Sequence, residues 1–363
     1  MQRLTVEGIR QEAQLREMLR EPAQSLRRGG LVAFPTETVY GLGANALVEE
    51  AVRRIFEAKE RPRDNPLIVH IAQDEQLRDV IDESQPLHED AVRLMRAFWP
   101  GPLTLLLPAG ARLAPSVHPG QPLVGVRMPD HPVARALIAE AGVPVAAPSA
   151  NRSGRPSPTT ADDVEADLGG QVDWLIDGGP CPIGVESTVL LLEPDCARIL
   201  RPGGVTQEMI ASVIDRPVLY AADAFDVSSA PLAPGMKYRH YAPNASVHVW
   251  WGAPEAIDEA MRAFLLEAVQ DDEVGEVMVP ALIAPDDFVR RFGWALSDER
   301  QAALPADAYA EELARHLYRL LRAFDRAGAT DVLVHGVDPT HGVGAAVMNR
   351  LYKASAGRVR WVG

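Results

Sequence analysis

The sequence predicts an α/β (α+β) protein with two domains, a larger one on a twisted, open, mixed sheet and a smaller, doubly wound, Rossmann-like one. Short apolar runs alternate with helix-length segments in both parts of the chain. At 363 residues the chain exceeds what one hydrophobic core usually organises. Residues 216–245, which are rich in proline, separate the parts like a linker. We therefore expect domains at residues 1–215 and 246–363.

Composition narrows the functional class. A formal net charge of −14 argues against generic binding to nucleic acid, which needs a basic face that displaces counterions. The apolar runs are too short to span a bilayer and the N-terminus shows no secretory signal, so we expect a soluble, cytoplasmic protein. With only two cysteines, Cys181 and Cys196, we expect reduced thiols and neither a disulfide framework nor a metal quartet.

The most constrained stretch begins after an amphipathic helix predicted at residues 6–29. A strand at residues 31–34 is followed by a polar loop with Thr36, Glu37 and Thr38. Gly41 and Gly43 follow, and we expect them to adopt backbone conformations closed to other residues. This is the pattern of a strand that runs into a loop closely approached by a ligand.

A cationic turn comes next. Apolar residues at helical spacing predict a helix that ends on Lys59, and Arg61, Arg63 and Asn65 follow before a strand at residues 67–71 that contains His70. Guanidinium and ammonium groups beside hydroxyls and an amide suit a polyphosphate. The alternative is a solvated helix end, where cations favour the helix dipole without any ligand.

The middle of the larger domain supplies one more cation. A broken helix at residues 77–98 and a buried strand at 103–107 precede a strand at 124–129 that carries Arg127 near its end. A strand end in an α/β sheet faces the usual ligand crevice, although a surface salt bridge is the ordinary alternative. A helix at residues 133–141 follows, and Gly142 is expected to end it.

A short strand at residues 143–147 leads to Ser149 and Asn151. Because these residues are two apart in an extended segment, they project to the same side and can face one ligand together. The alternative is a turn that only caps the next helix. Residues 157–160 are expected to cap that helix, at 161–168, and strands at 172–176, 187–192 and 197–200 complete the domain.

The smaller domain alternates strands and helices. Strands are expected at 247–251, 277–284 and 331–335, and helices at 254–268, 309–328 and 344–356. His335, Asp338 and His341 have the composition of metal ligands, but a strand-to-helix loop is the preferred interpretation. Neither a P-loop nor a full dinucleotide fingerprint occurs.

Several motifs together resemble one family. In order they are FPTETVYGLG, KERPRDNPLIVH, FWPGPLT, GVRMPDHP, APSANRSGRPSPT, GVESTVL and LRPGG, and KYRHYAP with a second domain follows. This series is similar to the YrdC-type threonylcarbamoyl-adenylate synthases in their long, two-domain form. The resemblance covers nearly the whole chain, and it implies a YrdC-like catalytic domain at residues 1–215.

The resemblance implies a nucleotidyl transfer. Such enzymes join L-threonine, bicarbonate or carbon dioxide, and ATP into threonylcarbamoyl-AMP and release pyrophosphate. Mg²⁺ would be held mainly by the ATP phosphates, without side-chain ligands. The product serves the downstream tRNA threonylcarbamoyl transferase machinery, which modifies the adenosine next to the anticodon, so tRNA binding by the synthase itself is expected to be weak or indirect.

The resemblance also assigns site residues. The residues that resemble threonine contacts are Thr38, His70, Arg127 and Ser187, with Arg127 pairing the carboxylate. Those that resemble ATP contacts are Arg61, Asn65, Ser149, Ser157, Arg201 and Tyr241. Lys59, Arg61, Ser149 and Asn151 form the expected catalytic set. Some relatives carry hydroxyl residues where this chain has Leu123 and Ala147.

Two other functions fit the same cationic face. One is an RNA-binding or ribosome-assembly factor, which would not turn over ATP. The other is a carbamoyl or acyl transferase that uses an adenylate instead of making it. Within the linker, residues 237–243 are too polar and aromatic for an idle tether, and we expect them to form a lid over the first-domain site.

Overall fold

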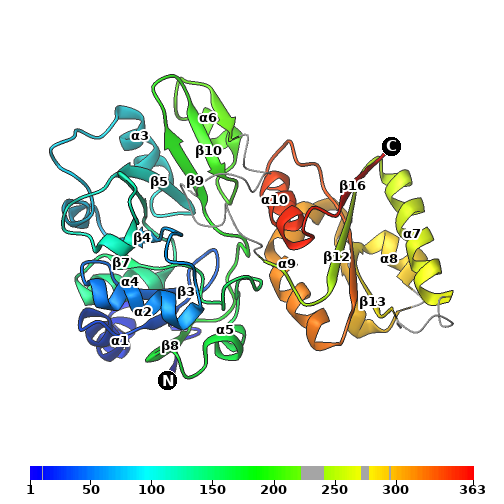
Figure 1. Cartoon of the computed structure of the whole chain (residues 1–363), viewed down its shortest axis with the longest axis horizontal. Coiled ribbons are helices and arrows are strands. Elements are labelled where there is room, and N and C mark those ends of the chain that lie inside the picture. The colour runs from blue at the N-terminus through cyan, green and yellow to red at the C-terminus, as the bar shows by residue number, and fades with distance from the viewer. Residues whose placement is uncertain (10, 222–240, 271–277, 294–295) are drawn as a thin grey trace. The chain divides into compact units, whose positions relative to one another are not determined.

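The computed structural model describes residues 1–9, 11–221, 241–270, 278–293 and 296–363 (Figure 1). They fall into two compact units. The first holds the described residues up to 221 except 154–156, and the second holds 154–156 together with the described residues from 241 onward. Each unit is a separate α/β fold, as the sequence predicts.

The first unit is built on a mixed sheet. Its order among the described residues is β1-β8-β2-β3-β7-β4-β6-β5-β9-β10-β11. Parallel pairs such as β4 with β6 stand beside antiparallel pairs such as β2 with β3. The strands are β1 (Gln2–Thr5), β2 (Val32–Phe34), β3 (Gly41–Asn45), β4 (Ile68–His70), β5 (Leu103–Pro108), β6 (Leu123–Arg127), β7 (Val145–Ala146), β8 (Trp174–Asp177), β9 (Thr188–Leu192), β10 (Ala197–Arg201) and β11 (Val218–Tyr220).

Helices cover both faces of this sheet, and strand β2 shows how. Its alternate side chains point to opposite faces: Ala33 joins a core with α2, and Phe34 joins a core with α1 and α4. The helices of the unit are α1 (Glu12–Arg27), α2 (Glu49–Lys59), α3 (Glu89–Phe98), α4 (Pro132–Ala141), α5 (Ala161–Leu168) and α6 (Gln207–Ala211), with 3₁₀ turns at Asp74–Asp79 and Pro115–Val117.

Local signals predicted two helix ends correctly. Gly142 ends α4 with a φ of 67°, in the left-handed region that glycine adopts without strain. Thr160 caps α5, because its hydroxyl accepts a hydrogen bond from the backbone N–H of Asp163 at 3.3 Å. The helix expected at 77–98 is instead a 3₁₀ turn followed by the shorter α3.

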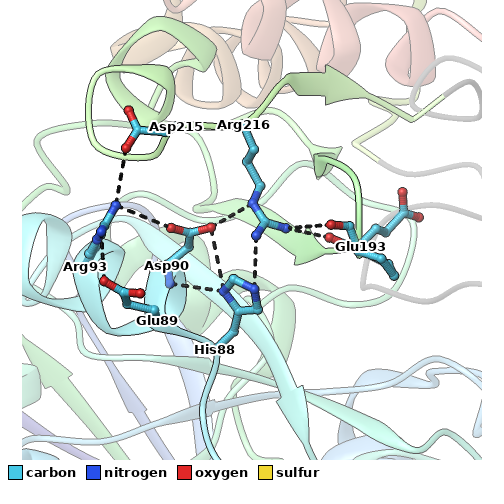
Figure 2. A network of polar contacts seen from close by, with 8 residues as sticks. His88, Glu89, Asp90, Arg93, Glu193, Asp215 and Arg216 are labelled. Atoms are coloured by element: carbon cyan, nitrogen blue, oxygen red, sulfur yellow. Dashed lines mark hydrogen bonds and ion pairs between the residues drawn. The ribbon is translucent and has the colours of Figure 1, made fainter.

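Arg216 ties the end of the first unit to α3 (Figure 2). Its Nε lies 2.7 Å from a carboxylate oxygen of Asp90, and its Nη1 donates to the carbonyl oxygen of Glu193 at 2.6 Å. The Nδ1 of His88 caps α3 by accepting from the N–H of Asp90 at 3.1 Å. Residues 216–220, which the sequence assigned to the linker, therefore belong to the first unit, where β11 pairs with β10.

The second unit holds a parallel sheet of order β14-β13-β15-β12-β16. Figure 1 shows α7 and α8 on one side of it and α9 and α10 on the other, so it is doubly wound, although its strand order differs from that of the usual dinucleotide-binding fold. Its strands are β12 (Ser246–Gly252), β13 (Pro280–Pro285), β14 (Gln301–Leu304), β15 (Asp331–His335) and β16 (Val359–Val362).

The helices of the second unit match the predicted alternation and add to it. They are α7 (Pro254–Gln270), α8 (Asp286–Phe292), α9 (Tyr309–Arg326) and α10 (Gly344–Ala354), with 3₁₀ turns at Asp298–Arg300 and Ala306–Ala308. The sequence did not predict α8, β14 or β16, which are short. Among the described residues, no helix combines the length and the apolar character needed to cross a membrane.

Candidate active site

The loop between β2 and β3 is folded by one threonine. The hydroxyl of Thr36 donates to the carbonyl oxygen of Val39 at 2.7 Å and accepts from the N–H groups of Thr38 and Val39 at 3.2 Å. This turn presents Glu37 and Thr38 in a buried position. Sequence reasoning did not identify the role of Thr36, although a threonine before a turn is a known signal for such bonds.

The two glycines of β3 do not supply backbone freedom, contrary to the expectation. Neither Gly41 nor Gly43 has a positive φ. A Cβ on Gly43 would lie 2.7 Å from the ring of Phe34 and 2.9 Å from the side chain of Val145, closer than real Cβ atoms approach. Gly43 therefore lets β3 lie close to its neighbours.

Arg127, at the end of β6, points into this loop. It is 3% exposed, so the alternative of a surface salt bridge is wrong. Its Nη1 donates to the hydroxyl of Thr38 at 3.0 Å, and its Nη2 lies 2.6 Å from a carboxylate oxygen of Glu37. His70 is the register partner of Arg127 on the neighbouring strand β4. The structure thus brings together Thr38, His70 and Arg127, three of the four predicted threonine contacts.

His70 is a neutral imidazole. Burial lowers the pKa of His70 to about 3, and the positive charge of Arg127 acts in the same direction. Its Nδ1 lies 3.2 Å from the carbonyl oxygen of Ile68, which is an acceptor, so Nδ1 carries the proton. A neutral imidazole can accept or donate a hydrogen bond near a substrate without adding charge.

The depressed pKa of His70 predicts acid sensitivity. Below pH 6.5 the unfolded chain protonates this histidine and the folded chain does not, so the free energy of unfolding falls as the pH drops toward 3. We expect His70→Gln to remove a slope that rises to about 1.4 kcal/mol per pH unit as the pH falls toward 5. Urea unfolding at pH 7, 6 and 5 measures it, with the exposed His341→Gln as control. An unchanged slope in His70→Gln would contradict the prediction.

Ser187, the fourth predicted threonine contact, lies with Arg201. Nε and Nη2 of Arg201 donate to the carbonyl oxygen of Ser187 at 3.1 and 3.0 Å, and Nη2 also reaches its hydroxyl at 3.1 Å. The same hydroxyl lies 2.8 Å from that of Thr104 on β5. A Cβ on Gly203 would meet the backbone of residues 186–188 at 2.3–2.4 Å, so only glycine allows this close approach.

Lys59 is not an exposed cation, so the alternative of a solvated helix end does not hold for it. It is 1% exposed. Its Nζ donates to the carbonyl oxygens of Ser149, at 2.5 Å, and Asn151. The hydroxyl of Ser149 donates to Oδ1 of Asn151 at 2.5 Å, so both side chains lie together, as their spacing predicted. Lys59 therefore fixes the loop that presents Ser149 and Asn151.

The rest of the cationic turn divides into a buried and an exposed part. Arg61 is buried, and its Nη2 donates to the carbonyl oxygen of Pro66 at 2.9 Å. Asn65 is buried too, and within the part of the chain that the structure describes its Oδ1 accepts no hydrogen bond. The side chain of Arg63 is 65% exposed and lies 3.7 Å from Glu57. The alternative of a solvated helix end holds only for Arg63.

The two remaining predicted ATP contacts are Ser157 and Tyr241. The hydroxyl of the buried Ser157 donates to Glu186 at 2.5 Å in the first unit. Tyr241 belongs to the second unit, where its ring stacks on Tyr318 with a centroid distance of 5.3 Å. Its contact with ATP stays a prediction, and residues 237–240 of the expected lid lie outside the described residues.

Asp338 and His341, two of the three candidate metal ligands, lie in the loop between β15 and α10. In the second unit, Oδ1 of Asp338 accepts from both the N–H and the hydroxyl of Thr340, at 2.8 and 2.6 Å. The exposed His341 lies 3.3 Å from the same carboxylate. Across the described residues no group of three or more His, Cys, Asp and Glu gathers that could hold a metal. The position of Asp338 and His341 between β15 and α10 matches the preferred interpretation of a strand-to-helix loop.

Backbone hydrogen bonds join the clusters of the first unit. Tyr40 donates its N–H to the carbonyl oxygen of Pro158, and Ala150 donates to that of Tyr40. Gly184 donates to the carbonyl oxygen of Thr38. The loops that carry the predicted threonine contacts and the Ser149 loop are thus one connected arrangement of cations, hydroxyls and amides. Such a set can bind and neutralise anionic groups in fixed positions.

Comparison with known proteins agrees with this arrangement. Residues 24–203 match the family described as "Telomere recombination", and residues 205–356 match "Threonylcarbamoyl-AMP synthase, C-terminal domain". The chain is 46% identical over 348 residues to the threonylcarbamoyl-AMP synthase of Bacillus subtilis, with 93% of each protein covered. It is 44% identical over 342 residues to that of Pyrococcus abyssi, with 94% of this chain and 95% of the relative covered.

A solved structure matches both units. The crystal structure of P. abyssi Sua5 complexed with L-threonine has a TM-score of 0.89 and 41% sequence identity to this chain, and the match covers all of both chains. Identity at this level over nearly the full length is well beyond a similarity of fold alone. The chain belongs to the threonylcarbamoyl-AMP synthase family, in its two-domain form.

Proposed function

We propose that the first unit makes threonylcarbamoyl-AMP from L-threonine, bicarbonate or carbon dioxide, and ATP, and releases pyrophosphate. The observation that carries this is the buried guanidinium of Arg127 beside the hydroxyl of Thr38, in a loop joined by hydrogen bonds to the loop that Lys59 holds. A buried cation next to a hydroxyl suits the carboxylate and hydroxyl of threonine. Membership of the synthase family and the threonine complex of the P. abyssi relative support the assignment.

The reaction has two bond-forming steps. The threonine ammonium group first loses a proton. The resulting amine forms an N–C bond with carbon dioxide, with loss of a second proton, or with bicarbonate, with loss of water, and either route gives a carbamate. A carbamate oxygen then attacks the α-phosphorus of ATP, and the bond to the β-phosphate oxygen breaks to release pyrophosphate. Positioning and charge neutralisation do most of the catalysis in such transfers.

The side chains divide the work as follows. Arg127 pairs the threonine carboxylate, and Thr38, His70 and Ser187 line the rest of the amino acid. Arg61 and Arg201 offset phosphate charge, and the other ATP contacts of the first unit are Asn65, Ser149 and Ser157. Lys59 holds the loop with Ser149 and Asn151 through its backbone carbonyls, so it acts by positioning this loop.

Mg²⁺ is proposed to arrive with ATP. Triphosphate oxygens are ligands that Mg²⁺ prefers, and we assign the ion no side-chain ligand. When bound, the ion would neutralise charge on the pyrophosphate leaving group. The side chains of Arg61 and Arg201 then bind the nucleotide beside it.

Pyrophosphate release tests the function. It should depend on ATP, on L-threonine and on bicarbonate together. Release of AMP from a supplied adenylate, without consumption of ATP, would indicate a transferase that only uses an adenylate. Salt-sensitive RNA binding without ATP turnover would indicate the RNA-binding alternative, which the comparisons do not support. The product is expected to pass, in the cytoplasm, to a tRNA threonylcarbamoyl transferase, with weak or indirect tRNA binding because the net charge is −14.

Threonine selection gives a prediction of its own. We expect 2-aminobutyrate, which lacks only the hydroxyl, to be used at least about 100-fold less efficiently than L-threonine, because a site that hydrogen-bonds a hydroxyl leaves buried groups unpaired with the analogue. Ratios of kcat/KM from pyrophosphate release measure this. Comparable use of the two amino acids would show that the hydroxyl is not recognised.

A further inference from the structure

Glu37 has no assigned role, yet it is among the most buried charged groups of the first unit. It is 5% exposed and lies in the loop between β2 and β3 that Thr36 folds. Its Oε1 is 2.6 Å from Nη2 of Arg127. Resting on the proposed function, we propose that Glu37 binds the α-ammonium group of the amino acid substrate while Arg127 binds its carboxylate.

The first support is a set of unpaired atoms. Among the described residues, five buried side-chain polar atoms accept or donate no hydrogen bond, and four of them belong to this pair: Oε1 and Oε2 of Glu37 and Nε and Nη2 of Arg127. The ion pair between Glu37 and Arg127 is short, but neither carboxylate oxygen of Glu37 accepts a hydrogen bond in it. Because a buried polar group normally has a partner, these atoms indicate a ligand that supplies both an acceptor and donors.

These atoms without hydrogen bonds match the carboxylate and the ammonium group of an α-amino acid. Nε and Nη2 form one edge of the guanidinium, and this edge fits the two oxygens of a carboxylate. Nη1 is already engaged with Thr38, which fixes the plane of the group. The carboxylate of Glu37 can only accept when it is ionised, and an ammonium group only donates.

Charge balance gives the second support. Glu37 and Arg127 together carry no net charge, so a zwitterion adds alternating charges and leaves the buried site neutral. A ligand with a carboxylate but no amine would leave one excess negative charge beside Glu37, which is costly away from water.

The neighbouring titratable groups do not neutralise Glu37. The negative charge of Glu37 acts to raise the pKa of His131 and of Cys181, so both residues lie near it. Burial lowers the pKa of His131 and raises the pKa of the Cys181 thiol, so both are uncharged at neutral pH. His131 and Cys181 therefore do not compensate the negative charge of Glu37. Compensation is left to Arg127 and to the ammonium group of the ligand.

A binding experiment on the full chain tests this. Calorimetric affinities are measured for L-threonine and for its analogue without the amine, 3-hydroxybutyrate, with wild type and with Glu37→Gln. Wild type should prefer threonine strongly. Since a hydrogen bond to a charged group contributes about 1.5–3 kcal/mol, the preference should shrink about 10–150-fold in Glu37→Gln. A purely structural role would weaken both ligands alike and leave the ratio unchanged, which would overturn the proposal.

Controls separate the possible causes. Asp90→Asn removes the carboxylate of an ion pair elsewhere in the first unit, between the buried Asp90 and the half-buried Arg216, and should leave the ratio as in wild type. If Glu37→Gln does not fold, Glu37→Asp retains the charge one methylene further back, and it should give a preference below that of wild type; an unaltered preference contradicts the proposal. A wild type that binds neither compound and releases no pyrophosphate would contradict the proposed function itself.

Discussion

Lys59→Met is expected to reduce pyrophosphate release by about 100–1,000-fold, the effect of removing one essential donor from a preorganised site. The variant keeps the length of the side chain and removes its charge. The carbonyl oxygens of Ser149 and Asn151 then lose a donor, and the loop they belong to is no longer held. Because each of these two buried acceptors costs about 1–3 kcal/mol without a partner, the free energy of unfolding should also fall by about 2–6 kcal/mol.

The matched control is Arg63→Met on the same turn. Its side chain is 65% exposed and makes one ion pair at 3.7 Å, so both stability and rate should change little. Steady-state kinetics and urea unfolding measure the two effects for each variant. If Lys59→Met had the stability and rate of Arg63→Met, the buried position of Lys59 would have no functional meaning.

Arg127→Gln is expected to lower kcat/KM for L-threonine by about 1,000-fold or more, because the substrate carboxylate then has no buried cation. The same change leaves Glu37 as a buried, uncompensated charge, which costs about 3–5 kcal/mol of stability. The double variant Glu37→Gln/Arg127→Gln removes both charges. It should regain most of the stability and none of the activity.

This double variant separates folding from catalysis. Two residues in contact show a coupling energy that their single variants do not reveal. Unfolding free energies of the four proteins give this coupling, and pyrophosphate release gives the activity of each. Recovery of activity with stability in the double variant would mean that Arg127 serves the fold and not the substrate.

Signals carried by neighbouring residues predicted much of this molecule. Gly142 after an apolar helix marks the end of α4, and a strand pattern at 124–129 places Arg127 at a strand end. The spacing of Ser149 and Asn151 predicted that they lie together. In each case the cause lies within a few residues of the effect.

What the sequence did not reveal depends on distant partners. The burial of Lys59 was not predicted, because its acceptors lie 90 and 92 residues further along the chain. Arg216 was assigned to a linker, because its partners Asp90, on α3, and His88, just before α3, lie far from it in the sequence. Glu37 was interpreted only as one of the polar residues of its loop, since its pairing with Arg127 requires β6 to be in place. Short elements such as β14 and α8 hold too few residues for a periodic pattern.

Strand β7 has a consequence for the order of folding. It contains only two residues, and it is paired with β3 on one side and β4 on the other. Two residues have too few interactions to nucleate, and closing the long loop back to β3 costs chain entropy before any contact repays it. This strand therefore docks onto neighbours that have already formed. During synthesis, a chain that ends before β7 carries Lys59 without its acceptors, so a truncated product has no catalytic loop at all.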